Sequence, residues 1–221
     1  MTDRRTHCIS GITLVHADPS IIVVNKQAGL LSVPGRGPDK QDCLSRRVAI
    51  GFSDALVVHR LDMATSGLVV MARSKECQRT LSQAFELGKI RKRYVAIVQG
   101  CVPATGDEWQ TIDLPIQVDW PNRPLRIIPA HGGQQSITRL RVLERDPERQ
   151  TTRVELEPLT GRTHQLRLHL QAIGHPILGD DLYNSNPGHH NVKRLLLHAQ
   201  ELAFEHPTTA LAMQFTCTAE F

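Results

Sequence analysis

The feature that most limits the fold is the arrangement of short apolar runs, which are separated by turns and accompanied by only two clearly helical segments. Runs of β-branched and other apolar residues of this kind are typical of strands. We expect strands at residues 21–24, 56–58, 68–71, 94–98, 138–143, 153–156 and 213–217, and a loop at residues 35–39. The strands do not alternate strictly with helices, so a parallel doubly wound sheet is disfavoured. The pattern predicts an α+β fold with a mixed, mainly antiparallel sheet and flanking helices and loops.

The first helical segment follows Ser74, whose hydroxyl is suited to cap a helix. Apolar residues recur behind it at helical spacing, namely Cys77, Leu81, Ala84 and Phe85. Gly88 is positioned to end this helix, because glycine readily adopts the left-handed conformation found just beyond a last turn.

The second helical segment is expected from about Thr163 to Ile173, with Thr160 or Thr163 as its cap and Gly174 at its end. Its two faces differ in chemistry: Leu166, Leu170 and Ile173 share one face, and His164, Arg167 and Gln171 share the opposite one. The polar face is expected to meet either solvent or a substrate.

The basic residues indicate the class of partner. The net charge is +4 over 221 residues, and 20 of the 26 basic residues are arginines. Arginine holds phosphate oxygens with a planar fork and stacks on bases, which favours a nucleic-acid partner. The alternative is a solvated surface or a GC-rich genome. Basic clusters occur at Arg46-Arg47, at 91–93 and at 123–126.

The cysteines and the apolar runs indicate a cytoplasmic protein that does not enter a membrane. Five widely spaced cysteines without a C-x-x-C pair do not predict a disulfide framework or a zinc site. Free thiols suit a reducing cytoplasm. No apolar run is long enough to span a bilayer, and the first residues lack the apolar segment of a secretory signal.

Residues 59–67, His-Arg-Leu-Asp-Met-Ala-Thr-Ser-Gly, form the first candidate site. The segment places a cation, Arg60, and a carboxylate, Asp62, on a short connection between two apolar strands. Such connections are held by a rigid scaffold while their side chains stay accessible, which is common at active sites. Considered alone, the pair is better interpreted as a structural Arg–Asp contact in a turn, because isolated pairs of this kind usually do little.

Residues 159–169, Leu-Thr-Gly-Arg-Thr-His-Gln-Leu-Arg-Leu-His, form the second candidate site. The conservative interpretation is a well-capped surface helix. His164 and His169 are five residues apart and therefore lie on different helix faces, which argues against a paired metal site.

Taken together, these segments resemble the RluA family of pseudouridine synthases. The matching segments are 24–30 (VNKQAGL, with Gln27 where the family usually has proline), 59–67, Tyr94, 161–167 (GRTHQLR), 174–180 (GHPILGD) and 197–199 (LHA). They cover nearly the whole chain in order. Residues 30–36 and 119–124 further resemble the compact subgroup that acts on both a 23S rRNA loop and a tRNA anticodon loop.

The resemblance implies a single pseudouridine synthase catalytic domain over residues 1–221, with no separate N-terminal RNA-binding domain. It implies that Asp62 is the catalytic carboxylate, that Arg167 is its basic partner and that Tyr94 lies at the active site. Three routes stay open for Asp62: attack on the sugar, attack on the base, and removal of a sugar proton.

The target uridine must leave the base stack before it can react. Arg60 is the candidate to fill the vacated space or to hold the distorted backbone. The other residues expected to bind RNA are His59, Arg162 and His164, together with six candidates for phosphate contacts, namely Arg36, Arg46, Arg47, Arg91, Arg93 and Arg123.

We expect no cofactor and no metal, because the isomerisation needs neither a redox change nor a group donor, and no phosphate-loop motif is present. We also expect a monomer without an obligatory protein partner. The alternatives are a single-target synthase, a non-catalytic RNA-binding module on the same fold, and a glycoside hydrolase. The last class normally needs two acids, and no second acid is evident near Asp62.

Overall fold

The computed structural model describes residues 8–103, 108–184 and 192–221. The chain divides into two compact units, the first made of residues 1–91 and 199–220 and the second of residues 92–198 with Phe221. The chain passes from one unit to the other within two long strands, β6 (Arg91–Gln99) and β12 (Leu197–Glu205).

The first unit is a sheet with the strand order β1-β2-β3-β5-β12, in which β1, β2, β3 and β5 pair antiparallel. Its strands are β1 (Cys8–Ile9), β2 (Ile12–Ala17), β3 (Ile21–Lys26) and β5 (Ser66–Ala72), followed by the part of β12 from Ala199 onward. Two short strands extend it, because β4 (Leu56–Val57) pairs with β5 and β13 (Ala212–Thr216) pairs with β12. β5 is buried over its whole length, so this strand lies at the centre of the unit.

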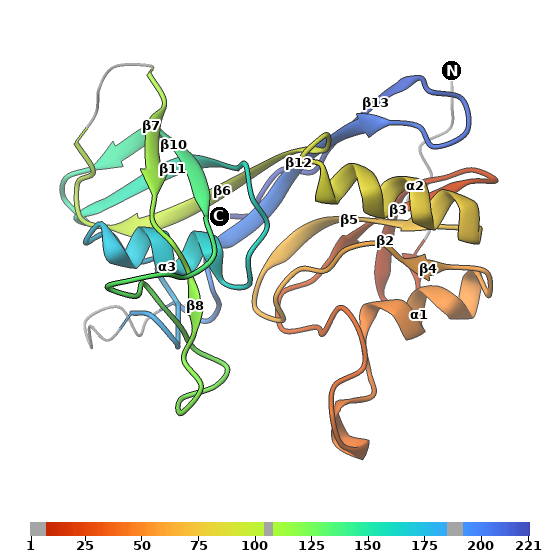
Figure 1. The fold of residues 1–221 in the computed structure, drawn as a ribbon, viewed down its shortest axis with the longest axis horizontal. Helices are drawn as coiled ribbons and strands as arrows, with labels where there is room; N and C mark the ends of the chain where they lie inside the picture. The colour runs from red at the N-terminus through yellow and green to blue at the C-terminus, as the bar shows by residue number, and fades with distance from the viewer. Residues whose placement is uncertain (1–7, 104–107, 185–191) are drawn as a thin grey trace. The chain divides into compact units, whose positions relative to one another are not determined.

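Two helices pack on this sheet (Figure 1). α1 (Leu44–Gly51) contacts β1 and β2, and α2 (Lys75–Glu86) contacts β4 and β5. α2 begins where the sequence predicts, because the Ser74 hydroxyl accepts a hydrogen bond from the backbone N–H of Cys77 at 3.1 Å. Its predicted apolar face packs into the core, with Cys77 and Leu81 buried and Ala84 and Phe85 half-buried against them.

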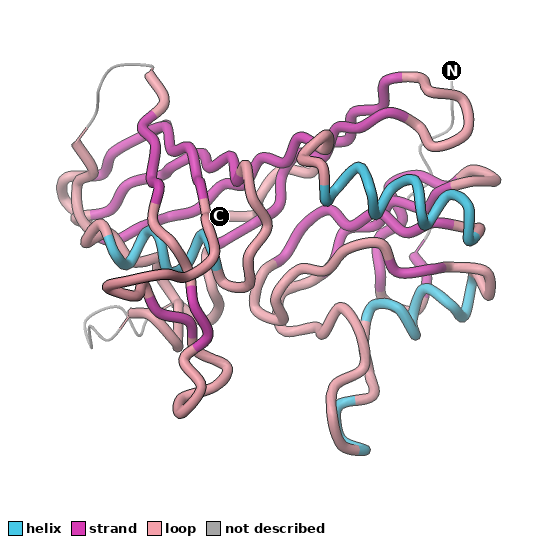
Figure 2. Tube along the Cα trace, in the orientation of Figure 1, coloured by secondary structure: helices cyan, strands magenta, loops and turns pink. Residues whose placement is uncertain are grey.

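The second unit is a four-stranded antiparallel sheet in the order β6-β11-β10-β7. Its strands are magenta in Figure 2. β7 spans Gln110–Asp113, β10 spans Ile137–Asp146 and β11 spans Thr151–Pro158. A separate hairpin is formed by β8 (Gln117–Val118) and β9 (Arg126–Ile127), which we call the β8–β9 hairpin. α3 (Gln165–Ala172) packs against β10 and β11.

The start and the surroundings of α3 differ from the sequence prediction. Its cap residue is His164, which has a left-handed backbone with φ 58° and makes no side-chain capping bond. Thr160 instead bonds the Gln165 side chain and the backbone N–H of Ile137. All residues from Gln165 to Leu170 are buried, so the polar side chains among them meet protein groups, whereas Gln171 of the predicted polar face is exposed. A short helix packed on a sheet and crossed by loops buries more than the one apolar stripe that periodicity predicts.

The α+β prediction is confirmed, because a mainly antiparallel sheet carries three α-helices among the described residues. All seven predicted strands are present, and a short 3-10 helix at Pro38–Lys40 closes the predicted loop. The sequence prediction missed β1, β2, β7, β8, β9, β12 and α1. The expectation of a single domain stays a prediction beside the two compact units.

Candidate active site

The loop that carries Asp62 is fixed through its backbone in the first unit. Leu61 is buried, and both its backbone groups bond Ser32: the Ser32 hydroxyl donates to the Leu61 carbonyl at 2.7 Å and accepts from the Leu61 N–H at 3.1 Å. The carbonyl of Asp62 accepts the Thr65 N–H at 3.1 Å. Asp62 itself is half-buried. The side chain is therefore presented from a rigid turn.

Lys26 reinforces this turn from inside the core. Its side chain is fully buried, and its ammonium donates to the carbonyls of Gln27, Leu30 and Met63 at 2.9, 2.7 and 3.1 Å. An ammonium has three donors, so it can bond three carbonyls at once. The lysine thereby ties the turn after β3 to the residue that follows Asp62. This role was not predicted, although the lysine lies in the first segment that resembles the family.

The backbone at the end of the Asp62 loop requires a glycine, Gly67. Its φ is 118°, a conformation that favours glycine. A Cβ placed there would lie 2.3 Å from the carbonyl oxygen and 2.5 Å from the nitrogen of Ala199. The backbones of the two motif segments therefore touch, and only glycine permits this approach.

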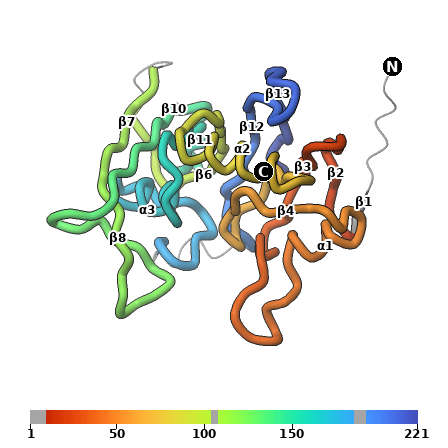
Figure 3. Tube along the Cα trace, turned by 45° about the vertical axis from the view of Figure 1, so that its right-hand side comes forward, coloured from red at the N-terminus to blue at the C-terminus, as the bar shows by residue number. Residues whose placement is uncertain are grey.

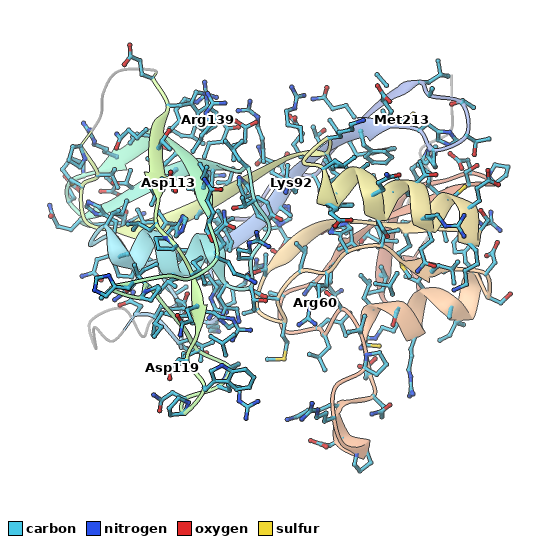
Figure 4. The ribbon with its side chains drawn as sticks, in the orientation of Figure 1. Arg60, Lys92, Asp113, Asp119, Arg139 and Met213 are labelled. Carbon is cyan, nitrogen blue, oxygen red and sulfur yellow. The ribbon has the colours of Figure 1, made fainter. Side chains whose placement is uncertain are left out.

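His59 and Arg60, on the same loop, differ in their surroundings. The His59 Nε2 accepts the backbone N–H of Val70 at 3.1 Å, and its ring stacks on Phe85 with centroids 4.3 Å apart. Both contacts fix the ring to the scaffold. Arg60 is exposed, and its side chain is labelled in Figure 4. Arg36, also exposed, lies in the loop before Pro38–Lys40.

In the second unit, Arg167 is buried and paired with Asp180. Its Nε and Nη2 donate to the two carboxylate oxygens of Asp180 at 2.8 and 2.6 Å, a bidentate geometry. The side chains are 5% and 0% exposed. Asp180 also accepts the backbone N–H groups of Leu182 and Tyr183. The guanidinium is thus held in a fixed direction. Asp180 lies in the motif at residues 174–180, but no role for it was predicted.

Tyr183 joins Arg167 to Arg126 and to His164, another predicted site residue. The Arg167 guanidinium lies 5.3 Å from the centre of its ring. Its hydroxyl accepts the backbone N–H of Arg126 and bonds His164 Nδ1, both at 2.8 Å. The Arg126 amide can only donate, whereas the direction of the bond between the hydroxyl and His164 depends on the histidine tautomer. Burial raises the pKa of Tyr183, so the phenol is neutral at neutral pH.

A second buried network lies beneath α3. Gln165 donates to the Thr138 hydroxyl at 3.0 Å, and that hydroxyl contacts His169 Nδ1 at 2.9 Å. His169 Nε2 contacts the Leu114 carbonyl at 3.0 Å. Since a carbonyl only accepts, the proton of the neutral ring lies on Nε2. His169 is fully buried, and this burial lowers its pKa.

Acidification is therefore expected to destabilise the protein through His169. The unfolded chain binds a proton at His169 below about pH 6.5, whereas the folded chain does so only at lower pH. The stability that the neutral ring contributes is complete above about pH 6.5. It is lost as the pH falls below that value, by at most about 1.4 kcal/mol per pH unit. Urea unfolding between pH 7.5 and 5.5 measures the slope. The variant His169→Gln should have a shallower slope, and equal slopes would contradict the assignment.

The remaining predicted residues of the second unit lie on β6 and in loops. Tyr94 is half-buried on β6, opposite Leu156 of β11. Arg162 is exposed, and its Nε donates to the Gln135 carbonyl at 3.3 Å. Arg123 is exposed in the β8–β9 hairpin. The predicted pairing of Arg167 with Asp62 stays a prediction.

The basic clusters are less available for contacts with RNA phosphates than the sequence indicates. Three of the six proposed phosphate contacts form ion pairs: Arg47 with Asp42 at 2.6 Å, Arg91 with Glu201 at 2.9 Å, and Arg93 with Glu155 at 3.2 Å. Burial lowers the pKa of Lys92, between the last two. Arg36, Arg46 and Arg123 stay exposed and are the stronger candidates.

Three further properties of the described residues concern metals, thiols and membranes. They contain no group of three or more His, Cys, Asp or Glu side chains arranged to hold a metal ion. Cys43, Cys77, Cys101 and Cys217 carry free thiols. In the part of the chain that the structure covers, no helix has the length and hydropathy needed to cross a bilayer.

Known proteins resemble the chain over almost its full length. The RNA pseudouridylate synthase family model matches residues 20–172. The dual-specificity RNA pseudouridine synthase RluA of Yersinia pestis is 45% identical over 94% of this chain and 99% of its own length. The protein of the same name from Escherichia coli K12 is 43% identical over 95% and 94%.

A solved structure shares the fold. Human RNA pseudouridylate synthase domain containing 1 superposes with a TM-score of 0.78 at 28% identity, covering 96% of this chain and 85% of that one. With the family model matched over more than half of the residues and relatives this similar along nearly the whole sequence, the chain belongs to the RNA pseudouridylate synthase family and is an isomerase that acts on RNA.

Proposed function

We propose that the protein converts uridine to pseudouridine in both a 23S rRNA hairpin loop and a tRNA anticodon stem-loop. The observation that carries the proposal is the identity of 45% along nearly the whole chain to relatives named dual-specificity synthases. Residues 30–36 and 119–124, which resemble that subgroup, support it. The reaction moves the bond to the sugar from a ring nitrogen to a ring carbon, so it needs no redox partner.

Asp62 is the proposed catalytic carboxylate. Its turn is fixed by Ser32 and Lys26, so the carboxylate can be aimed without reorganisation when the substrate arrives. A carboxylate held there can attack the sugar, attack the base or take a sugar proton. Each route needs an ionised and directed side chain, and a nearby cation supplies both conditions.

Arg167 and Tyr94 are the proposed partners of Asp62. The buried bidentate pair with Asp180 gives Arg167 one orientation. The aromatic ring of Tyr94 is suited to stack on the uracil, and its hydroxyl is suited to hydrogen-bond or to move a proton. Both assignments come from the family motif that the two residues match.

Arg60 is the proposed residue for the flipped state. It is exposed and lies two residues before Asp62, so it can reach the space that the uridine leaves. Opening the stack costs a few kcal/mol, which contacts to the displaced strand can offset. We further propose that the enzyme works in the cytoplasm, as a monomer and without metal or cofactor.

The decisive experiment offers the two stem-loops separately to purified enzyme and maps pseudouridine in each. Modification of both is expected. Modification of one at saturating enzyme would leave a single-target synthase. Activity only on another cellular RNA would refute the proposed substrates and leave the chemistry intact.

Tyr183 is expected to act as a positioning residue for Arg167. Tyr183→Phe keeps the ring and loses two hydrogen bonds, so stability should fall by about 1–3 kcal/mol while most turnover survives. Tyr183→Leu also removes the ring beside the guanidinium, and kcat should fall at least about ten-fold with little change in KM. Urea unfolding and single-turnover assays measure both effects. Equal turnover in the two variants would remove the ring from this role.

A further inference from the structure

Trp120 is unusually exposed for a residue of its size. Only 4% of the chain is aromatic, and one of its two tryptophans lies 64% exposed in the β8–β9 hairpin. Figures 1 and 3 show this hairpin extending away from the sheet and helix of its own unit. A large exposed aromatic forgoes much stabilisation by burial, so such a side chain commonly marks an interaction surface.

The charge around Trp120 suits a nucleic acid. The Arg123 guanidinium lies 4.7 Å from the centre of the Trp120 ring. Residues 117–127 hold two arginines and one aspartate, a net charge of +1. The carboxylate of that aspartate, Asp119, accepts the side chain and the backbone N–H of Asn122, at 3.0 and 3.3 Å. A ring with a cation on one face can offer its other face to a base, and the cation can meet the adjoining phosphate.

The hairpin is held so that the ring needs little ordering before it binds. The Asp119 N–H donates to the Leu125 carbonyl at 3.1 Å, and the Leu125 N–H donates to the Asn122 carbonyl at 3.0 Å. At its base, the Arg126 N–H donates to the Tyr183 hydroxyl. Asp119, labelled in Figure 4, begins the turn that carries the ring. A preorganised ring loses less entropy on binding.

The other tryptophan shows the contrast. Trp109 is half-buried, and the guanidinium groups of Arg93, Arg139 and Arg141 lie 4.8, 4.9 and 5.0 Å from its ring centre. These arginines also pair with Glu155 and Glu157. Trp109 is therefore enclosed in a network of the protein itself, whereas Trp120 has one cation and open solvent.

We propose that Trp120, backed by Arg123, is a stacking platform for an unpaired base of the substrate RNA other than the target uridine. The inference rests on the proposed action on RNA loops and adds a residue that selects them. Such a platform accepts any base with an open face, which suits an enzyme that takes two different loops.

Binding of the synthetic anticodon stem-loop to Trp120 variants tests the proposal. Trp120→Ala and Trp120→Leu should weaken binding about 10- to 100-fold, the range for the loss of one stacked base, and Trp120→Phe should keep most of the affinity. The turnover rate at saturating RNA should stay within about two-fold in all three. Leu211→Ala, which trims an equally exposed side chain of the other unit, is the matched control and should change nothing.

Two readouts separate stacking from charge. In a Trp109→Phe background, Trp120 emission should be quenched by the stem-loop. Arg123→Gln should lower the salt dependence of binding by about one phosphate contact, whereas Trp120→Ala should leave it unchanged. Replacing one loop nucleotide by an abasic unit should abolish the difference between Trp120→Ala and the unaltered protein.

Two results would overturn the proposal: unchanged affinity in Trp120→Leu, or unchanged Trp120 emission at saturating RNA. Either result with full activity on the stem-loop would leave the proposed function standing. An unaltered protein that neither binds nor modifies the stem-loops would refute the proposed substrates, and this inference would fall with them.

Discussion

Asp62→Asn is expected to abolish isomerisation while the protein stays folded. The amide keeps the shape of the carboxylate but has neither its charge nor its basicity, so all three chemical routes open to Asp62 are lost. The turn itself should persist, because the bonds that hold it involve backbone groups, Ser32 and Lys26. Mass spectrometry of pseudouridine in a stem-loop measures the first effect, and thermal unfolding measures the second.

The control for this variant is Asp39→Asn, which removes an exposed acid from the short 3-10 helix of the same unit and should keep full activity. RNA binding by Asp62→Asn should also survive, because phosphate contacts dominate affinity for nucleic acids. Turnover by Asp62→Asn comparable to that of the unaltered enzyme would refute the catalytic role. Loss of binding together with turnover would reassign Asp62 to substrate docking.

The elements that the sequence predicted are those with a local signal. The β-branched run at residues 21–24 lies in β3, and the cap at Ser74 with its apolar spacing defines α2. The missed elements have weak local signals. β12 mixes His198, Gln200 and Glu201 with apolar residues, and it forms a strand because β5, far earlier in the chain, and β13 pair with it. Such tertiary pairing overrides local propensity.

The polar face of α3 shows why side-chain roles are harder to predict than elements. Periodicity places Arg167 on a polar face, and solvent or substrate were the expected neighbours. The structure gives this arginine a buried partner, Asp180, thirteen residues away. The role of Tyr183 was equally hard to predict, because its contacts with Arg126, His164 and Arg167 join segments that are far apart in sequence. The arginine clusters predicted only exposed phosphate contacts. Half of the arginines proposed for such contacts instead form ion pairs within the protein.

The family motif therefore identifies site residues without saying what fixes them. Gly67, Lys26 and Asp180 all lie in segments quoted for the resemblance, yet their roles follow from contacts: a close backbone approach, three carbonyls and a bidentate ion pair. Each of these residues restricts a proposed catalytic side chain or its loop. The motif is thus explained in physical terms as a set of positioning contacts around few reactive groups.

The second large effect is expected at the pair Arg167–Asp180. Asp180→Ala leaves a buried guanidinium without its counter-charge and two backbone N–H groups without their acceptor, so stability should fall by about 3–5 kcal/mol. Arg167→Ala leaves a carboxylate that still accepts the N–H groups of Leu182 and Tyr183, so the loss of stability should be smaller. Urea unfolding of both variants and of the double variant measures the coupling between the two side chains.

Activity distinguishes a structural pair from a catalytic one. If Arg167 directs Asp62, Arg167→Ala should lower the single-turnover rate by a hundred-fold or more, on the order of 3 kcal/mol of transition-state stabilisation, with RNA affinity nearly unchanged. Arg167→Lys restores the charge but not the bidentate geometry, so it should rescue little. A variant that loses only salt-dependent affinity and keeps its full rate would make Arg167 an RNA-docking residue. A variant that loses stability alone, and regains full activity at low temperature, would leave the pair with a purely structural role.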